Sequence, residues 1–274
     1  MAKSAEAEVE KMKLLEERIK APSIWGRLPC GLRFEDLQDR RYEDAVRFLK
    51  KHFLQEEITY RSVKLVEDTE GADEFVHNVR IWMKDKMSIA AVKEGTDKLV
   101  GVLIMRIQEK NAFTRTFSRV KLTHNPLYTT IMKFYNEVEN PVDIFEKLGV
   151  RKYFKVYILA LKQRYRHRGI AKEMLKAAIP LAASANVPAI AGIFTTARSQ
   201  QIAEEIGFEK LHEIYYIRYL IDEQVVFWDT GLGNYSAALM AYRIPEIEEA
   251  VEIKQHGSSR FNVQPLDDEE KIPE

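Results

Sequence analysis

The chain has few of the residues that build disulfide frameworks or thiolate metal sites. Its 274 residues include a single cysteine, Cys30. One cysteine cannot form an intrachain disulfide or supply the several thiolates of a cysteine-based zinc site. No pair of histidines with nearby carboxylates has the spacing of metal ligands, so we expect no metal. The low cysteine content predicts a reducing compartment, and we expect a cytoplasmic protein.

The chain also lacks an excess of charge of either sign. It carries 42 lysines and arginines against 42 aspartates and glutamates, for a formal net charge of zero. A nucleic-acid binder needs a basic face to neutralise phosphates, so we expect no nucleic-acid partner. With 46% hydrophobic residues the chain can bury one sizeable core, and its length allows one domain or two.

A long, strongly apolar run is missing as well. The segment 177–197 has no charged residue, but Pro180, Pro188 and Gly192 interrupt it. A membrane-spanning helix needs roughly 20 mostly apolar residues, and prolines break helices. We therefore predict a helix end followed by a buried strand, and no membrane partner. Because the first 20 residues are charged throughout, we also expect no signal peptide.

The two ends of the chain differ in composition from the middle. Residues 1–29 combine a charged helix that has a narrow apolar stripe with a linker bounded by Pro22 and Pro29. Residues 246–274 are acidic and poor in aromatics, which predicts a flexible tail. We therefore expect one domain over residues 30–245, and we find no internal repeat.

The spacing of apolar residues predicts an alternation of strands and helices within this domain. We expect strands at 32–37, 88–92, 99–107, 153–161, 189–194, 208–220 and 237–244, and helices at 41–53, 72–87, from 169 onward and at 198–206. Residues 111–149 fit this rhythm poorly and predict a helical insertion over one side of the core. The order predicts an α/β fold with a mixed central sheet flanked by helices.

The most informative stretch is an apolar strand that runs into a basic turn. The strand ends at Leu161, and the turn from Arg166 to Ala171 opens directly into a helix. The first backbone N–H groups of a helix have no intrahelical partner, and the helix dipole places positive charge there. Such a turn is suited to a phosphate or pyrophosphate.

This turn resembles the acyl-CoA signature of the GNAT superfamily of N-acetyltransferases, Arg/Gln-x-x-Gly-x-Gly/Ala. The matching positions are Arg166, His167, Arg168, Gly169, Ile170 and Ala171. The resemblance implies the GNAT fold from about Leu32 to Ile244, with acetyl-CoA or another acyl-CoA as co-substrate. It also implies that the turn amides bind the pyrophosphate.

The same resemblance assigns a role to the strand that precedes the turn. In GNAT proteins strand edges splay beside this motif, and the freed backbone amides meet the pantetheine and the thioester. The corresponding positions here are Leu159, Ala160 and Leu161. A plain core strand remains compatible with the same residues.

A second segment, Phe53-Leu-Gln-Glu56-Glu57, is similar to the Phe-x-x-Asp-Glu-Pro-Leu segment of the insect arylalkylamine N-acetyltransferases. The resemblance implies that Glu57 is the general base. Two adjacent carboxylates raise one another's pKa if both are buried. Paired glutamates at a helix end are otherwise solvated, and Ile58 replaces the proline of those enzymes.

A third segment, from Phe194 to Ser199, resembles the part of the insect enzymes that offers two hydroxyls close to the thioester sulfur. These hydroxyls fall on Thr195 and Ser199. The alternative is a helix N-cap, for which Thr195 or Thr196 would serve. Ala203 occupies the position at which many bacterial and protein-modifying relatives have a tyrosine acid.

The resemblances together predict an N-acyltransferase that acts on a small primary amine, an arylalkylamine. The proposed catalytic residues are Glu57, Thr195 and Ser199. Two alternatives stay open: a protein or peptide N-acetyltransferase, and a non-catalytic acyl-CoA-binding protein. The sequence gives no prediction of the oligomeric state.

Overall fold

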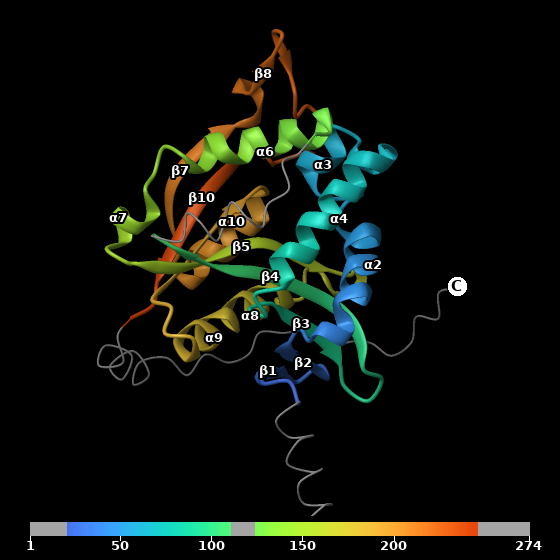
Figure 1. Ribbon diagram of the computed structural model, residues 1–274, viewed down its shortest axis with the longest axis vertical. Helices are drawn as coiled ribbons and strands as arrows, with labels where there is room; N and C mark the ends of the chain where they lie inside the picture. The colour runs from blue at the N-terminus through green and yellow to red at the C-terminus, as the bar shows by residue number, and fades with distance from the viewer. Residues whose placement is uncertain (1–20, 111–123, 246–274) are drawn as a thin grey trace, which may run out of the picture.

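A central sheet organises the molecule (Figure 1). The computed structural model describes residues 21–110 and 124–245. The order of strands across the sheet is β1-β2-β3-β4-β5-β6-β10-β7. The strands are β1 Ile24–Leu28, β2 Leu32–Asp36, β3 Ile89–Lys93, β4 Lys98–Glu109, β5 Lys152–Leu161, β6 Ala189–Phe194, β7 Glu209–Tyr215 and β10 Ser236–Arg243. The short strands β8 Leu220–Ile221 and β9 Gln224–Val225 form a separate hairpin.

Strands β5 and β6 are paired in parallel, whereas their neighbours in the sheet pair antiparallel. Their register covers three pairs and ends at Val156 opposite Gly192. Beyond this point β5 continues along β4 to Leu161 opposite Gly101, and β6 continues along β10 to Phe194. The edges of β5 and β6 that face each other therefore separate toward their carboxyl ends.

Helices cover both faces of the sheet (Figure 1). One face carries α2 Tyr42–His52, α3 Ile58–Ser62, α4 Thr69–Met83, α6 Pro126–Glu139 and α7 Ile144–Leu148; the other carries α8 Ile170–Lys176, α9 Ala178–Ser184 and α10 Ala197–Ile206. Single turns of 3₁₀ helix lie at Asp39–Arg41, Leu65–Glu67, Gln163–Tyr165 and Tyr216–Arg218.

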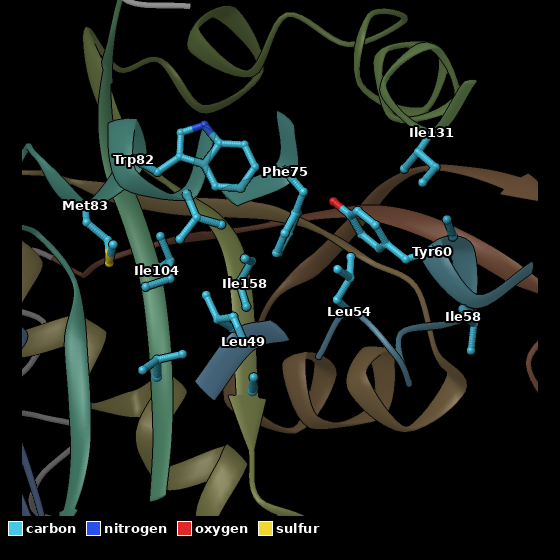
Figure 2. Packing of buried hydrophobic residues seen from close by; sticks show 14 of the residues in the cluster. Leu49, Leu54, Ile58, Tyr60, Phe75, Trp82, Met83, Ile104, Ile131 and Ile158 are labelled. Carbon is cyan, nitrogen blue, oxygen red and sulfur yellow. The ribbon is translucent and has the colours of Figure 1, made fainter. Parts of the chain in front are cut away.

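Each face has its own apolar core. Figure 2 shows the first, in which Leu49 of α2 and Phe75 and Trp82 of α4 lie beside Ile104 of β4 and Ile158 of β5. In the second core, α8, α9 and α10 bury side chains such as Met174, Leu181 and Ala203. The sheet is thus buried on both sides, which positions its central strands rigidly.

Most elements predicted from the sequence are confirmed. The 88–107 hairpin forms with its turn between Lys93 and Lys98, β6 spans 189–194 as predicted, and α10 begins one residue before the predicted start. The strand predicted over 208–220 ends at Tyr215, where a 3₁₀ turn follows. Helices α6 and α7 confirm helical structure in the 111–149 insertion. The predicted helix in 1–20, the segment 111–123 and the 246–274 tail lie outside the described residues.

The expected linker between Pro22 and Pro29 is wrong, because this segment contains strand β1. The two prolines lie outside the strand and do not interrupt its hydrogen bonds to β2. An edge strand such as β1 tolerates nearby prolines. Trp25 fixes it further, since the indole Nε1 donates to Asp36 Oδ1 at 2.6 Å.

The uncharged segment 177–197 is divided between α9 and β6. Helix α8 ends at Lys176 and α9 begins at Ala178, so Pro180 lies in the first turn of α9. A proline ring clashes with the carbonyl four residues earlier, which explains a break at this place. None of the helices in the described residues has the length and apolar character needed to cross a membrane.

A substitution at Gly101 tests the close contact between β4 and β5. A Cβ at this position would lie 2.9 Å from the backbone oxygen of Ala160 and 2.4 Å from Leu161 Cδ2. We expect Gly101→Ala to lower the free energy of unfolding by about 2–3 kcal/mol through overpacking. In the control Gly95→Ala, no atom lies within 4 Å of the new Cβ and φ is +77°, so the cost is the left-handed strain of about 1 kcal/mol. Equal losses in urea denaturation would contradict the prediction.

Candidate functional site

A cavity of 390 Å³ lies where β5 and β6 separate. Its walls come from the loop between α2 and α3, from α4 and α6, from β5, and from the chain that joins β6 to α10. Most of the lining is apolar or aromatic, as in Phe53, Tyr60 and Trp82. Three charged residues also line it: Glu57, Glu139 and Lys155. An apolar cavity with a few convergent charged groups is the usual form of a small-molecule site.

Glu57 is held in one orientation by hydrogen bonds. It is the N-cap of α3, and its Oε2 accepts from the backbone N–H groups of Thr59 at 2.9 Å and Tyr60 at 3.1 Å. The Thr59 hydroxyl donates to the same oxygen at 2.5 Å. On the other oxygen, Oε1, the Thr195 hydroxyl donates at 2.7 Å. An ionised carboxylate oxygen has two lone pairs, so the capacity of Oε2 is used and Oε1 can accept one more proton or hydrogen bond.

The environment of Glu57 favours its protonated form. Burial raises the pKa of its carboxyl, and the hydrogen bonds from Thr59 and Thr195 oppose this effect only in part. The surface that Glu57 still exposes belongs to the cavity lining. A carboxylate with a raised pKa in a cleft is a candidate proton acceptor near neutral pH.

The sequence predicted that Glu56 and Glu57 raise one another's pKa if both are buried. This condition is not met, because Glu56 is not buried. Glu56 is 38% exposed at its side chain and forms an ion pair with Arg166. It therefore lies outside the cavity lining, and burial of Glu57 alone raises the pKa. The two glutamates are adjacent in the sequence, but their carboxylates bond different partners, Glu56 to Arg166 and Glu57 to Thr59, Tyr60 and Thr195.

The hydroxyl residues after β6 divide between two tasks. Thr195 contacts Glu57, and its backbone oxygen accepts from the Tyr216 hydroxyl at 2.6 Å. Thr196 is the N-cap of α10, and its hydroxyl accepts from the Ser199 N–H at 3.1 Å. The Ser199 hydroxyl donates to the Thr196 carbonyl at 2.8 Å. Both Thr195 and Ser199 line the cavity, yet the proton of the Ser199 hydroxyl is used within the cap.

The predicted cofactor strand has an edge that no strand of the described part of the chain pairs with. Leu159, Ala160 and Leu161 follow the last β5–β6 pair, at Val156, while their other edge bonds to β4. Leu159 also lines the cavity. Backbone amides on this edge are therefore placed to bind a ligand that runs along β5 toward Glu57.

The basic turn has the backbone form expected of an anion site. His167 and Gly169 are both left-handed, with φ of +61° and +78°, and Gly169 is the N-cap of α8. Alternating left-handed residues at a helix start direct successive N–H groups into one concavity. Ile170 begins the helix and is buried, and Ala171 packs against the same core. The turn residues thus fit the pyrophosphate of an acyl-CoA.

Arg166 has a different arrangement from the rest of the turn. Its guanidinium bonds Glu56, the His52 oxygen at 3.1 Å and the Leu161 oxygen at 2.9 Å. It therefore fastens the turn to the end of α2, next to the loop that carries Glu57. The side chain of Arg168 also has an interaction within the chain.

Three contacts at the site have no clear signal in the sequence. The Tyr135 hydroxyl lies 2.7 Å from Thr59 Oγ1, and because the single proton of Thr59 goes to Glu57, Tyr135 is the donor. Tyr216 anchors Thr195 from the far side. Lys155 and Glu139 form an ion pair in the cavity wall. The sequence offers one hint of the ion pair: Lys155 is a charged residue inside an otherwise apolar strand.

In the described part of the chain, no group of three histidine, cysteine, aspartate or glutamate side chains is arranged to hold a metal ion.

Solved structures of insect N-acetyltransferases are similar to this chain. One, assigned as arylalkylamine N-acetyltransferase 7 of the yellow fever mosquito, is 26% identical with a TM-score of 0.72, over 82% of this chain and 96% of that chain. Arylalkylamine N-acetyltransferase 2 of Aedes aegypti is 23% identical with a TM-score of 0.71, over 78% and 99%. A polyamine N-acetyltransferase of Drosophila melanogaster, which forms N-acetylagmatine, is 13% identical with a TM-score of 0.62, over 77% and 99%.

No protein-family model and no curated protein sequence matches the chain. The structural likeness nevertheless covers nearly the whole of the neighbouring chains. This chain therefore has the GNAT fold, as the strand-and-turn motif predicted, and its structural neighbours are insect arylalkylamine N-acetyltransferases. The fold and these neighbours support N-acetyltransfer from an acyl-CoA.

The raised pKa of Glu57 predicts a particular pH dependence of stability. The folded-state pKa lies above the ordinary value of 4.5, so the carboxyl favours folding when protonated and loses this contribution as pH rises from 4.5 through the folded-state pKa. In Glu57→Gln this dependence is absent. We expect thermal unfolding between pH 4 and pH 8 to show the wild type losing Tm relative to Glu57→Gln as pH rises. A wild type that gains on the variant would indicate a lowered pKa.

Proposed function

We propose that this chain is an acyl-CoA-dependent N-acyltransferase that moves an acetyl or longer acyl group to a primary amine, an arylalkylamine. The observation that carries the proposal is the position of Glu57: a carboxylate with a raised pKa, fixed by four hydrogen bonds, in the cavity at which the free edge of β5 ends. The aromatic walls of this cavity favour an aryl group as the body of the acceptor.

The first step in this mechanism is removal of a proton from the acceptor. A primary alkylamine has a pKa of roughly 10, so it arrives as an ammonium and cannot attack until it loses a proton. Glu57 Oε1 is the oxygen with remaining capacity, and it accepts this proton directly or through water. Thr59, Tyr60 and Thr195 keep the carboxylate in place during the transfer.

The neutral amine then attacks the thioester carbon, and the new C–N bond forms as the carbonyl becomes an oxyanion. Backbone N–H groups of β5 near Leu161 stabilise this oxyanion, because this edge has no strand partner in the described chain. Collapse of the intermediate re-forms the carbonyl and breaks the C–S bond, and the surplus proton of the attacking nitrogen passes to the departing thiolate. Once Glu57 Oε1 carries the first amine proton, it donates to Thr195 Oγ1, which leaves the Thr195 hydroxyl proton free to bond the thiolate sulfur. Ser199 contributes a second hydroxyl oxygen to the same wall, while its proton is held by the Thr196 carbonyl.

The acyl-CoA itself is held by the chain at two places. The turn from Arg166 to Ala171 binds the pyrophosphate through its amides from His167 onward, because the Arg166 N–H donates to the Gln163 oxygen, and residues 159–161 bind the pantetheine. Arg166 supports the turn indirectly, through its bonds to Glu56 and to the His52 oxygen.

The first test of this proposal is the variant Glu57→Gln. We expect free-thiol release from acetyl-CoA with phenethylamine, tyramine and dopamine, and we expect Glu57→Gln to lower kcat by about 10²–10⁴-fold, the range for loss of a general base. In the wild type kcat/KM should rise with pH through the raised pKa of Glu57. Turnover of a short peptide alone would favour a peptide acetyltransferase. Binding of acetyl-CoA without turnover of any amine would favour a non-catalytic protein.

A second prediction separates Thr195 from its neighbour Thr196. Thr195→Val keeps the shape but removes the donor to Glu57 Oε1, and loss of a hydrogen bond to a charged group is worth about 1.5–3 kcal/mol, so we expect kcat to fall about 10- to 100-fold. In the control Thr196→Val, the N-cap of α10 is lost, which costs about 1 kcal/mol of stability, with kcat within about threefold of the wild type. Equal kcat values for the two variants would contradict the role of Thr195.

A further inference from the structure

The ion pair between Glu139 and Lys155 has no part in the proposed chemistry, although it lines the same cavity as Glu57. Glu139 is the last residue of α6, and Lys155 lies on β5 opposite Ala191. Their side chains are only 19% and 22% exposed. An ion pair with so little exposure costs desolvation energy, and an apolar pair of the same volume would serve stability equally well.

Helix α6 sets the distance between this pair and the base. Tyr135 donates to Thr59, which in turn donates to Glu57. Glu139 follows Tyr135 by four residues, which places it on the same face of the helix, about 6 Å further along the axis. One face of α6 therefore carries both Tyr135, which supports Glu57 through Thr59, and Glu139 of the ion pair. A compact acceptor bound at Glu57 would place its far end close to the pair.

Lys155 stays charged. Burial opposes the charge of Lys155, but the Glu139 carboxylate together with Tyr157 and Tyr153 outweighs burial and raises the pKa of Lys155. The Lys155 ammonium also lies 5.3 Å from the centre of the Tyr157 ring, and Trp82 stacks on this ring at 4.4 Å. An ammonium has three donors and a carboxylate about four acceptor positions, so the pair can still bond a ligand.

We propose that the Glu139–Lys155 pair determines acceptor specificity: it selects amines whose far end is a neutral group that both donates and accepts hydrogen bonds, and it rejects a second charge. This inference rests on the proposed function. A hydroxyl on an aryl ring meets the requirement, since it donates to Glu139 while it accepts from Lys155.

An acceptor amine with a second charge at its far end binds poorly for electrostatic reasons. A second ammonium is attracted by Glu139, but it must lie beside the Lys155 ammonium that the same carboxylate holds. A carboxylate at the far end is attracted by Lys155, but it must lie beside the Glu139 carboxylate of the same charge. Within a cavity of low polarity these repulsions are stronger than in water. The pair would thus separate the acceptors of this chain from polyamines, the class named for the polyamine N-acetyltransferase of similar fold.

The experiment compares three amines with acetyl-CoA: tyramine, phenethylamine, which differs from it only in the ring hydroxyl, and putrescine, which carries a second ammonium. In the wild type we expect kcat/KM for tyramine to exceed that for phenethylamine by at least about 10-fold and that for putrescine by at least about 100-fold, which corresponds to one and two steps of 1.4 kcal/mol.

The double variant Lys155→Met/Glu139→Leu removes both charges and avoids leaving one unpaired. We expect it to bring kcat/KM for tyramine within about threefold of that for phenethylamine. The matched control is Arg106→Met/Asp85→Leu, which removes a pair of comparable burial, 7% and 18% exposed, that does not line the cavity. It should retain the wild-type ratio.

The outcomes distinguish this inference from the function on which it rests. Turnover of phenethylamine and tyramine at equal kcat/KM in the wild type, or a preference for putrescine, overturns the specificity role and leaves the N-acyltransferase intact. An unchanged ratio in a folded double variant does the same. Absence of thiol release with all three amines overturns the proposed function itself. The wild-type comparison decides the question even if the double variant fails to fold.

Discussion

The site depends on one constraint: β5 and β6 stay paired for three residues and then separate. The strands are very close at their last pair, where a Cβ on Gly192 would lie 3.0 Å from Val156 Cβ. Beyond it each strand keeps its outer partner, β4 for β5 and β10 for β6. The separation therefore leaves unpaired only the backbone groups on the two facing edges. A ligand that bonds these edges replaces the missing strand contacts, which explains how a rigid sheet can contain a binding cleft.

The carboxylate of Glu57 joins the start of α3 to the chain that follows β6, at the open end of this cleft. Its Oε2 is bonded within its own turn, to Thr59 and Tyr60, whereas its Oε1 is bonded to Thr195, which continues from β6. Lys155 lies in the same cavity with its charge maintained by Glu139. Burial thus favours the neutral form of one group, and a partner favours the charged form of another. The cavity therefore holds a carboxyl that can take up a proton and, beside it, a charge that stays fixed.

The sequence predicted the elements whose signals are local. The basic turn identified the fold because its glycine, its charges and the preceding apolar strand are contiguous, and the 189–194 strand was bounded by clear breaks. The misses arise from tertiary contacts. The ion pair of the Arg166 guanidinium with Glu56, on a segment 110 residues away, has no local signal. The role of Tyr135 and the pairing of Lys155 with Glu139 depend on where α6 crosses the sheet, which no local pattern encodes.

The replacement of a proline by Ile58 raised the question of whether the carboxylate of Glu57 is still correctly aimed. A proline at the first position of a helix helps because its φ is fixed in advance. Ile58 achieves a similar restriction by burial: it is 4% exposed and belongs to the core beneath the cavity. Glu57 itself has φ of −66° and ψ of 131°, the extended conformation of a helix cap. Because the orientation of the carboxylate is set by its hydrogen bonds to Thr59 and Tyr60 and by this packing, the proline is dispensable for holding the Glu57 carboxylate in this orientation.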